Sequence, residues 1–219
     1  MPSLYVSADN ADGYVSSTST SNWTSARDAT SGNASHNDAS SSYAIRERNY
    51  AGRGGGTQRV VFRSFFTFDT SGITSAPSEA ILKIDGITSN TCDFFAVKST
   101  HSVPIVDGDL DAITGWSSGA DNEGNVTKYS AEITSWSTSG YNDITLTEDA
   151  RDDMASLSTF KVCLIGSIYD LRNVEPTANY DASSAVIYKD YSGTSKDPYI
   201  DYTVAVAVVD DAVFLGANF

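Results

Sequence analysis

The stretch FRSFFTFDTSGI, residues 62–73, indicates a β-protein, because its apolar residues follow the alternation of a β-strand. Neighbouring side chains of a strand point to opposite faces of the sheet. Phe62, Phe66 and Phe68 therefore share one face, which we expect to be buried between two sheets. Phe65 points to the opposite face and needs a cover of its own.

Two covers for Phe65 are compatible with the sequence. Residues 14–42 are rich in Ser, Thr, Asn, Asp and Gly, yet they carry Tyr14 and Trp23, which a free linker seldom contains. A neighbouring subunit is the alternative. We favour the Ser/Thr-rich segment, because it needs a place to bury its own aromatic side chains.

The rest of the chain repeats the strand pattern. Short apolar or alternating runs such as EAILKIDGI, TFKVCLIGSIY and PYIDYTV are separated by turn sequences such as TSNTCD and SSGADNEGN. One short helix is expected in TEDARDDMASL, with Thr147 as its N-cap. The sequence predicts an all-β protein: an antiparallel, jelly-roll-like β-sandwich with one short helix and a C-terminal extension.

The chain divides into one domain and a tail. We expect residues 1–204 to form a single β-sandwich domain. Within it, residues 1–42 form a Ser/Thr-rich segment that packs on the sandwich. Residues 205–219 follow the closing strand and form an apolar tail, and apolar side chains left in water favour association. The tail is therefore predicted to dock on its own domain or on another chain, through Val209, Val213, Phe214, Leu215 and Phe219.

The charge limits the partners. The formal net charge of the 219 residues is −14, with a sequence pI near 4.3. Such a surface repels phosphate backbones and anionic lipid headgroups, so nucleic acids and membrane surfaces are not expected as partners. The N-terminus lacks the pattern of a secretory signal, and no run approaches the ~20 apolar residues of a membrane helix. We expect a chain made in a cytoplasm.

No pattern in the sequence indicates catalysis. The two histidines, His36 and His101, are far apart and lack an evident triad partner, and no nucleophile elbow, zinc-protease or Walker motif is present. Cys92 and Cys163 each lie in or beside an apolar run, where a reduced thiol or one disulfide fits equally. We expect a protein that is not an enzyme and needs no cofactor, with calcium as the one ion to consider.

The calcium hypothesis rests on one acidic loop. VDGDLDAITG places Asp107, Asp109 and Asp111 at alternating positions, and carboxylate oxygens in loops are the ligands that Ca²⁺ takes. The full twelve-residue calcium loop with a closing Glu is missing. A solvated acidic turn is the favoured alternative.

The three tryptophans are candidates for glycan binding. Trp23, Trp116 and Trp136 all lie among Ser, Thr and Gly residues, in SNWTS, TGWSS and TSWST. An exposed aromatic ring beside hydroxyl groups suits a sugar. The alternative for each is that it caps an open end of the sandwich core, which is the favoured role.

From Arg63 onward the chain resembles a β-sandwich family named for its DNRLRE motif, which is similar to carbohydrate-binding modules. The resemblance is carried by RSFFTFDTSGI, SEAILKIDGI, YSAEITSWSTSGYNDITLT and the closing KDPYIDYTV, whereas the DNRLRE motif itself is absent. It implies a jelly-roll-like sandwich, as in modules of bacterial surface proteins and in phage virion proteins, without catalytic machinery. Because Arg63 matches the motif position, we expect it to be a structural residue bonded to carbonyl and carboxylate groups.

Two functions follow as hypotheses. The first is a non-enzymatic virion structural protein of a bacteriophage: a capsid decoration, head-fibre or tail-associated protein. It would dock on other virion proteins through its apolar tail, as a homo-oligomer for which a trimer is a reasonable order. The alternative is a carbohydrate-binding module acting on cell-surface or matrix polysaccharide. The two roles are compatible, with the sandwich touching glycan and the tail acting as anchor.

Overall fold

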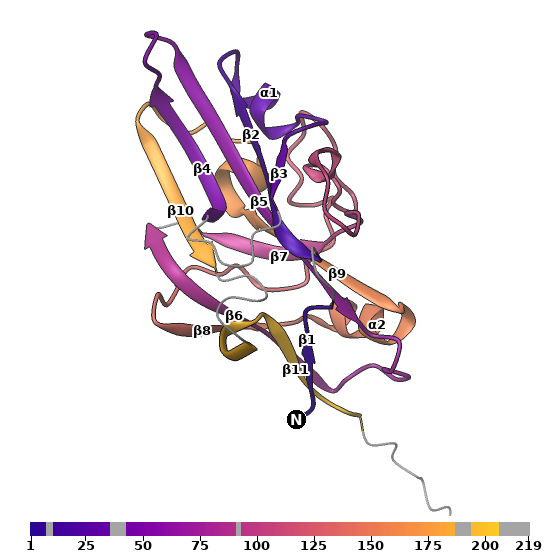
Figure 1. The fold of residues 1–219 in the computed structure, drawn as a ribbon. Coiled ribbons are helices and arrows are strands. Elements are labelled where there is room, and N and C mark those ends of the chain that lie inside the picture. Colours follow the sequence, from indigo (N-terminus) through magenta and orange to yellow (C-terminus); the bar gives the residue numbers. More distant parts are fainter. Residues whose placement is uncertain (8–10, 36–42, 91–92, 187–193, 206–219) are drawn as a thin grey trace, which may run out of the picture.

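The computed structural model describes residues 1–7, 11–35, 43–90, 93–186 and 194–205 (Figure 1). Within these residues the chain forms eleven β-strands and a few short helices. The strands are β1 (Ser3–Tyr5), β2 (Asp12–Ser19), β3 (Asn33–Ser35), β4 (Tyr43–Ala51), β5 (Thr57–Asp69), β6 (Glu79–Asn90), β7 (Phe94–Lys98), β8 (Gly140–Thr145), β9 (Thr159–Gly166), β10 (Tyr180–Val186) and β11 (Tyr199–Thr203). The helices are α1 (Trp23–Arg27), α2 (Glu148–Ser156), the 3₁₀ turns η1 (Asp107–Asp109) and η3 (Thr194–Lys196), and the π-helical turn η2 (Ser167–Leu171).

The predicted helix is α2, and its N-terminus is capped as expected. The Thr147 hydroxyl accepts a hydrogen bond from the Ala150 N–H at 3.4 Å. Helix α1 was not predicted, because its five residues are too few to show a helical period. It is held by an Asn22 cap, whose side chain accepts from the Ser25 N–H at 2.7 Å.

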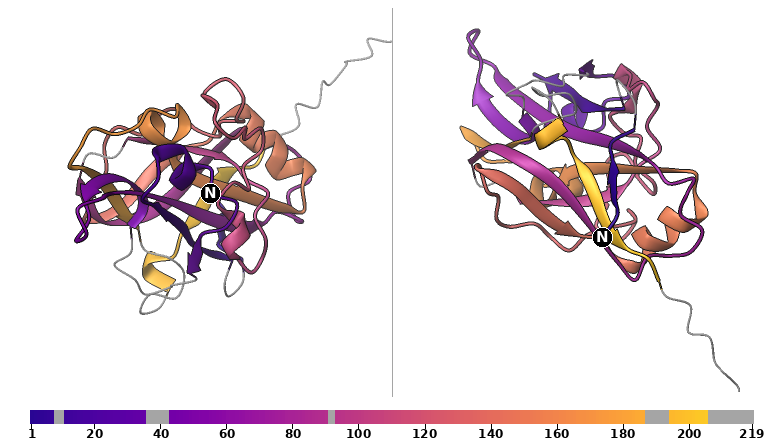
Figure 2. Two further views of the ribbon diagram at one scale, coloured as in Figure 1. Left: turned by 90° about the horizontal axis from the view of Figure 1, so that it is seen from above. Right: turned by 60° about the horizontal axis from the view of Figure 1, so that its bottom comes forward.

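The strand pairings described in the structure are all antiparallel, and they form two layers (Figure 2). In one layer β5 pairs with β2 on one side. On its other side β5 pairs first with β4 and then with β9. Strand β3 extends this layer beyond β2, and β7 extends it beyond β9. In the other layer β6 pairs with β11 and β8, and β1 extends it. Strand β10 pairs with both β4 and β6, and so joins the layers. The predicted antiparallel all-β sandwich is confirmed.

The inner core lies between the two layers. Phe66 and Phe68 of β5 are fully buried there, against Leu82 and Ile84 of β6 and other apolar side chains. Phe62 shares their face, as the alternation predicts, but it lies beyond the centre of the core. It is only partly buried, and its ring centroid lies 5.2 Å from that of Tyr14.

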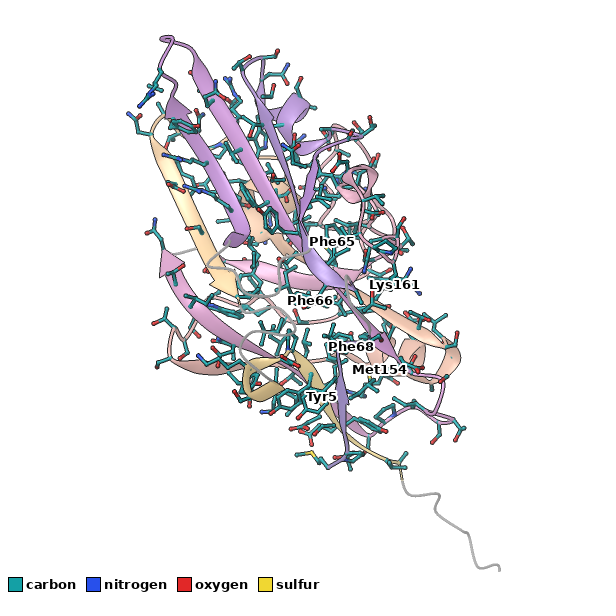
Figure 3. The ribbon with its side chains drawn as sticks, in the orientation of Figure 1. Tyr5, Phe65, Phe66, Phe68, Met154 and Lys161 are labelled. Carbon is teal, nitrogen blue, oxygen red and sulfur yellow. The ribbon has the colours of Figure 1, made fainter. Side chains whose placement is uncertain are left out.

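Phe65 is fully buried in a second core on the opposite face of β5 (Figure 3). The predicted cover, residues 14–42, supplies Val15 to this cluster. Most of the cover comes instead from the connection between β7 and β8, which contributes Ile105, Leu110, Ile113 and Val126. This connection has no strand of its own and few apolar runs, so its role as a third layer was not visible in the sequence. Its apolar residues meet only when it folds over the sheet.

A buried ion pair fixes this outer layer to the sheet. Arg63 of β5 donates to both carboxylate oxygens of Asp170 in η2, at 2.8 and 2.5 Å, and both side chains are at most 1% exposed. Its remaining donors bond the carbonyl oxygens of Leu110, at 2.5 Å, and Arg27, at 2.9 Å. A planar guanidinium whose three nitrogens all donate to acceptors is the arrangement that makes a buried arginine tolerable. The structural role expected for Arg63 agrees with these contacts.

Glu47 of β4 lies beside this ion pair and is 3% exposed. Its Oε1 accepts a hydrogen bond from the Asp170 N–H at 2.9 Å. Burial, and then the negative charge of Asp170, raises the pKa of Glu47 to about 8. Gly166 leaves room for this carboxyl group, because a Cβ there would lie 2.0 Å from Oε1.

Both ends of residues 1–204 belong to the same layer, since β1 pairs with β11. The predicted docking residues Val209, Val213, Phe214, Leu215 and Phe219 lie outside the described residues, as do His36 and Cys92. Cys163 is a free thiol, buried in the outer core. No helix in the described chain is both long enough and apolar enough to cross a membrane.

The raised pKa of Glu47 predicts a dependence of stability on pH. The folded protein holds the Glu47 proton up to about pH 8, whereas the unfolded chain releases it near the ordinary glutamate pKa of 4.5. Its contribution to stability is therefore complete below pH 4.5 and is lost as the pH rises to about 8, by up to ~1.4 kcal/mol per pH unit. Glu47→Gln cannot titrate and keeps an Oε1 acceptor for the Asp170 N–H.

The measurement is the free energy of unfolding in urea from pH 4.5 to 8.5, for the wild type and for Glu47→Gln. We expect the free energy of unfolding of the wild type to fall relative to that of the variant as the pH rises. The other titrating groups are common to both proteins, so their contributions cancel in the difference. A difference that stays constant over this range would show that Glu47 titrates normally.

Candidate functional site

A groove of about 720 Å³ lies at an open seam of the sandwich, lined by residues 130–137 and 141–145. One wall is formed by residues 130–137, which run alongside β7. A β-bridge joins Ile133 of this segment to Phe94 of β7. The other wall is β8, which pairs with β6 on its far side. The groove thus separates a segment attached to one layer from a strand of the other.

The groove exists because these two segments meet at both ends and separate in between. At one end Ser130 bridges to Leu146, and the Thr147 N–H donates to the Tyr129 oxygen at 2.9 Å. At the other end the Asn142 side chain holds Ser137, accepting from its N–H at 2.6 Å and donating to its oxygen at 3.0 Å. The opening is therefore defined by hydrogen bonds at its two ends.

The lining combines aromatic rings with hydrogen-bonding groups. Trp136 and Tyr141 supply the aromatic surface, and both are half-buried. Glu132 on one wall and Asp143 on the other are exposed carboxylates. The remaining polar groups are mostly the hydroxyls of Ser and Thr. A concave surface with an aromatic patch and a few directional polar groups is the general form of a small-ligand site.

Trp136 has a defined position in the groove. Its ring packs edge-on against Phe94 of β7, with centroids 5.2 Å apart. On its other side it approaches the backbone of β6 at Gly86, where a Cβ would lie 2.7 Å from Nε1 and 2.0 Å from the Ser137 oxygen. The glycine is therefore required by the close approach of residues 136–137.

The other two tryptophans are not in the groove. Trp23 of α1 is 2% exposed and donates its Nε1–H to the Tyr169 oxygen at 3.1 Å, so no ring face is open to a sugar. Trp116 is half-buried beneath the guanidinium groups of Arg27 and Arg63, which lie 4.2 and 4.1 Å from its ring centroid. Both placements fit the structural alternative. The structure does not bring the three tryptophans together.

The three aspartates of the calcium hypothesis are also not brought together. Asp109 is 5% exposed, and its two oxygens accept from the N–H groups of Ser102 and Val106. Asp107 accepts from the Ala34 N–H at 2.7 Å and so links the loop to β3. In the part of the chain that the structure describes, no three acidic, His or Cys side chains gather as a metal site. Asp107 and Asp109 order the loop as hydrogen-bond acceptors.

His101 is fully buried and cannot reach a substrate. Ser99 donates its hydroxyl proton to the Ala112 oxygen at 2.7 Å, so it accepts from His101 Nδ1–H at 2.8 Å, and Nε2 is left to accept from Thr67 at 2.9 Å. Burial, and then the charge of Lys161, lowers the pKa of His101 to about 3. Its contribution to stability is therefore present above pH 6.5 and is lost as the pH falls toward 3.

Neither a scan against protein-family models nor a search of curated proteins found a match for this chain. The resemblance to the DNRLRE family therefore rests on the short motifs alone. Any functional inference has to come from the site itself.

Sequence reasoning identified one groove residue, Trp136, and missed its neighbours. Tyr141 and Asn142 lie directly after the same STSG turn, and Gly86 interrupts the apolar alternation of β6. A glycine within a strand often marks the close approach of another backbone. This signal was available, but it does not say which segment approaches.

The close contact at Gly86 yields a prediction for Gly86→Ala. The added methyl group must displace residues 136–137, so we expect Trp136 to move and the protein to lose about 1–3 kcal/mol of stability. The position of Trp136 is followed by its indole N–H resonance in NMR, assigned with Trp136→Phe.

Gly72→Ala is the matched control, because no atom lies within 4 Å of a Cβ at that position. It should leave the indole resonances in place. An unchanged Trp136 resonance in Gly86→Ala would contradict the described packing.

Proposed function

We propose that this chain is a non-enzymatic, carbohydrate-binding β-sandwich whose ligand occupies the groove between residues 130–137 and β8. The observation that carries the proposal is the composition of the groove, in which Trp136 and Tyr141 stand among hydroxyl, amide and carboxylate groups. Sugar rings present apolar C–H faces that pack on aromatic rings, while their hydroxyls need directional partners. Both requirements are met in one concave surface.

The size and preorganisation of the groove support this role. Its volume of about 720 Å³ lies within the range of small-ligand sites in proteins. Its walls are joined at both ends by the Asn142–Ser137 and Thr147–Tyr129 hydrogen bonds, so little ordering has to accompany binding. The acidity of the whole chain disfavours a nucleic acid as the ligand.

Trp136 makes the proposal testable by fluorescence. A glycan in the groove changes the environment of Trp136 but leaves Trp23 and Trp116, which lie outside the groove, unaffected. We expect glycan-array binding by the wild type, with a saturable change in tryptophan emission on titrating the positive glycan. Trp136→Ala should lose at least tenfold in affinity, about 1.4 kcal/mol.

Trp116→Phe is the control, since it keeps an aromatic ring beneath the two arginines and lies outside the groove. Melting temperatures are measured for all variants, so that loss of fold is told apart from loss of binding. A folded Trp136→Ala protein that binds as the wild type does would refute the groove as the site.

We also propose, as a second role, that the protein is displayed on the exterior of a bacteriophage particle, as a decoration, head-fibre or tail-associated protein. The tail sequence motivates this role, together with one feature of the described chain. Met1 and Val204 are 72% and 57% exposed, and they lie at the same end of the molecule because β1 pairs with β11. The apolar tail thus begins at an end that already exposes apolar side chains.

Removal of the tail separates docking from folding. Strand β11 ends at Thr203, so a chain of residues 1–204 keeps every described strand. We expect it to be soluble, with the melting temperature of the full chain, but to lose the self-association and particle binding of the full chain. Sedimentation velocity, with and without purified particles, measures both. An unfolded truncation product would show that the tail is part of the core.

A further inference from the structure

Three tyrosines form a continuous stripe on the outer face of the layer that contains β8. The Tyr5 and Tyr199 ring centroids are 5.3 Å apart, and those of Tyr199 and Tyr141 are 5.0 Å apart. Tyr5 is 49% exposed, and the other two are half-buried. Figure 3 shows Tyr5 on β1, at the far side of this layer from β8. The stripe therefore crosses the whole layer.

The strand register explains the stripe. Tyr5 is opposite Tyr199, which is opposite Lys83, which is opposite Asp143. Tyr141 lies two residues before Asp143 and so projects from the same face of β8. Tyr141 and Asp143 also line the groove. The stripe is thus continuous with the groove.

The charges along the stripe are mainly negative. Lys83 is the only cation in strands β1, β6, β8 and β11, and its ammonium group is bonded to Asp143 at 2.7 Å. Lys196 of η3 reaches the same face and lies 3.7 Å from a carboxylate oxygen of Asp85. Asp201 lies on the same face and accepts from the Ser3 hydroxyl at 2.5 Å. Glu132 adds a further carboxylate at the groove. A polyanionic ligand would meet repulsion along this path.

We propose that the ligand is a long, uncharged polysaccharide. One part of the chain occupies the groove, and the rest runs across β6 and β11 to Tyr5. This inference rests on the proposed carbohydrate-binding function and extends it to the class of glycan. The matching features are length and charge. The Tyr5 and Tyr199 rings meet at 33° and the Tyr199 and Tyr141 rings at 80°, so the stripe offers a long chain successive contacts with ring faces and edges, whereas a short oligosaccharide in the groove reaches only Tyr141.

The test compares a short and a long glycan of the same linkage, cellobiose and cellohexaose, by calorimetric titration of the full chain. We expect cellohexaose to bind at least tenfold more tightly than cellobiose. Tyr5→Ala should reduce cellohexaose affinity about two- to tenfold, the range for one stacked aromatic ring, and leave cellobiose affinity unchanged. Tyr5→Phe should retain the affinity for both, because the ring and not the hydroxyl makes the contact.

Tyr50→Ala is the matched control, since this half-buried tyrosine lies on β4, outside the stripe. It should leave both affinities unchanged. Polygalacturonate tests the charge argument and should bind more weakly than cellohexaose.

Three outcomes would overturn the inference while leaving the groove proposal intact: equal affinity for both oligosaccharides, an unchanged affinity in Tyr5→Ala, or tighter binding of polygalacturonate. Failure to bind either oligosaccharide, with a positive glycan array for another class, would also overturn it. A negative array would refute the proposed function itself.

Discussion

The buried Arg63–Asp170 ion pair is the contact on which the outer half of this molecule depends. A guanidinium removed from water is costly unless every donor finds an acceptor. All three guanidinium nitrogens of Arg63 donate, to Asp170 and to two backbone carbonyls from separate segments. Those segments also contact the sheet elsewhere: the β7–β8 connection is bridged to β7, α1 packs on β2 and β5, and η2 packs on β7 and β9. The ion pair joins all three to β5 at one buried point, and the second core around Phe65 forms beneath them.

Two titratable groups in the interior, Glu47 and His101, have shifted pKa values. Glu47 accepts from the backbone of Asp170, and burial with the neighbouring charge favours its neutral form. His101, packed 5.1 Å from the Phe65 ring centroid, is likewise kept neutral by burial. Shifted pKa values commonly mark active sites, but these two groups are enclosed in packed layers. Here they reflect the cost of burying charge beneath a third layer, and no substrate can reach them.

The surfaces suited to recognition lie away from this layer, where the sandwich is not sealed. Strand β8 and residues 130–137 are held together only at their ends, so hydroxyl groups and two aromatic rings line the opening between them. The tyrosine stripe continues from the same strand. The apolar tail starts at the end marked by Met1 and Val204. Glycan contact and docking would therefore use different surfaces, and the two proposed roles do not compete for one site.

Several features of this protein could be predicted from its sequence. Alternation placed Phe66 and Phe68 in the inner core and Phe65 on the other face, Thr147 capped the expected helix, and the antiparallel sandwich followed from short strands and turn residues. Strand alternation, turn chemistry and the helix cap depend on neighbours within a few residues, and the fold class follows from them. The long-range contacts came only from the folded structure: the cover of Phe65, the partner of Arg63, the burial of Trp23 and Trp116, and the assembly of the groove from two segments. Each of these joins residues distant in the chain, and local periodicity carries no information about which distant segment folds over a given face.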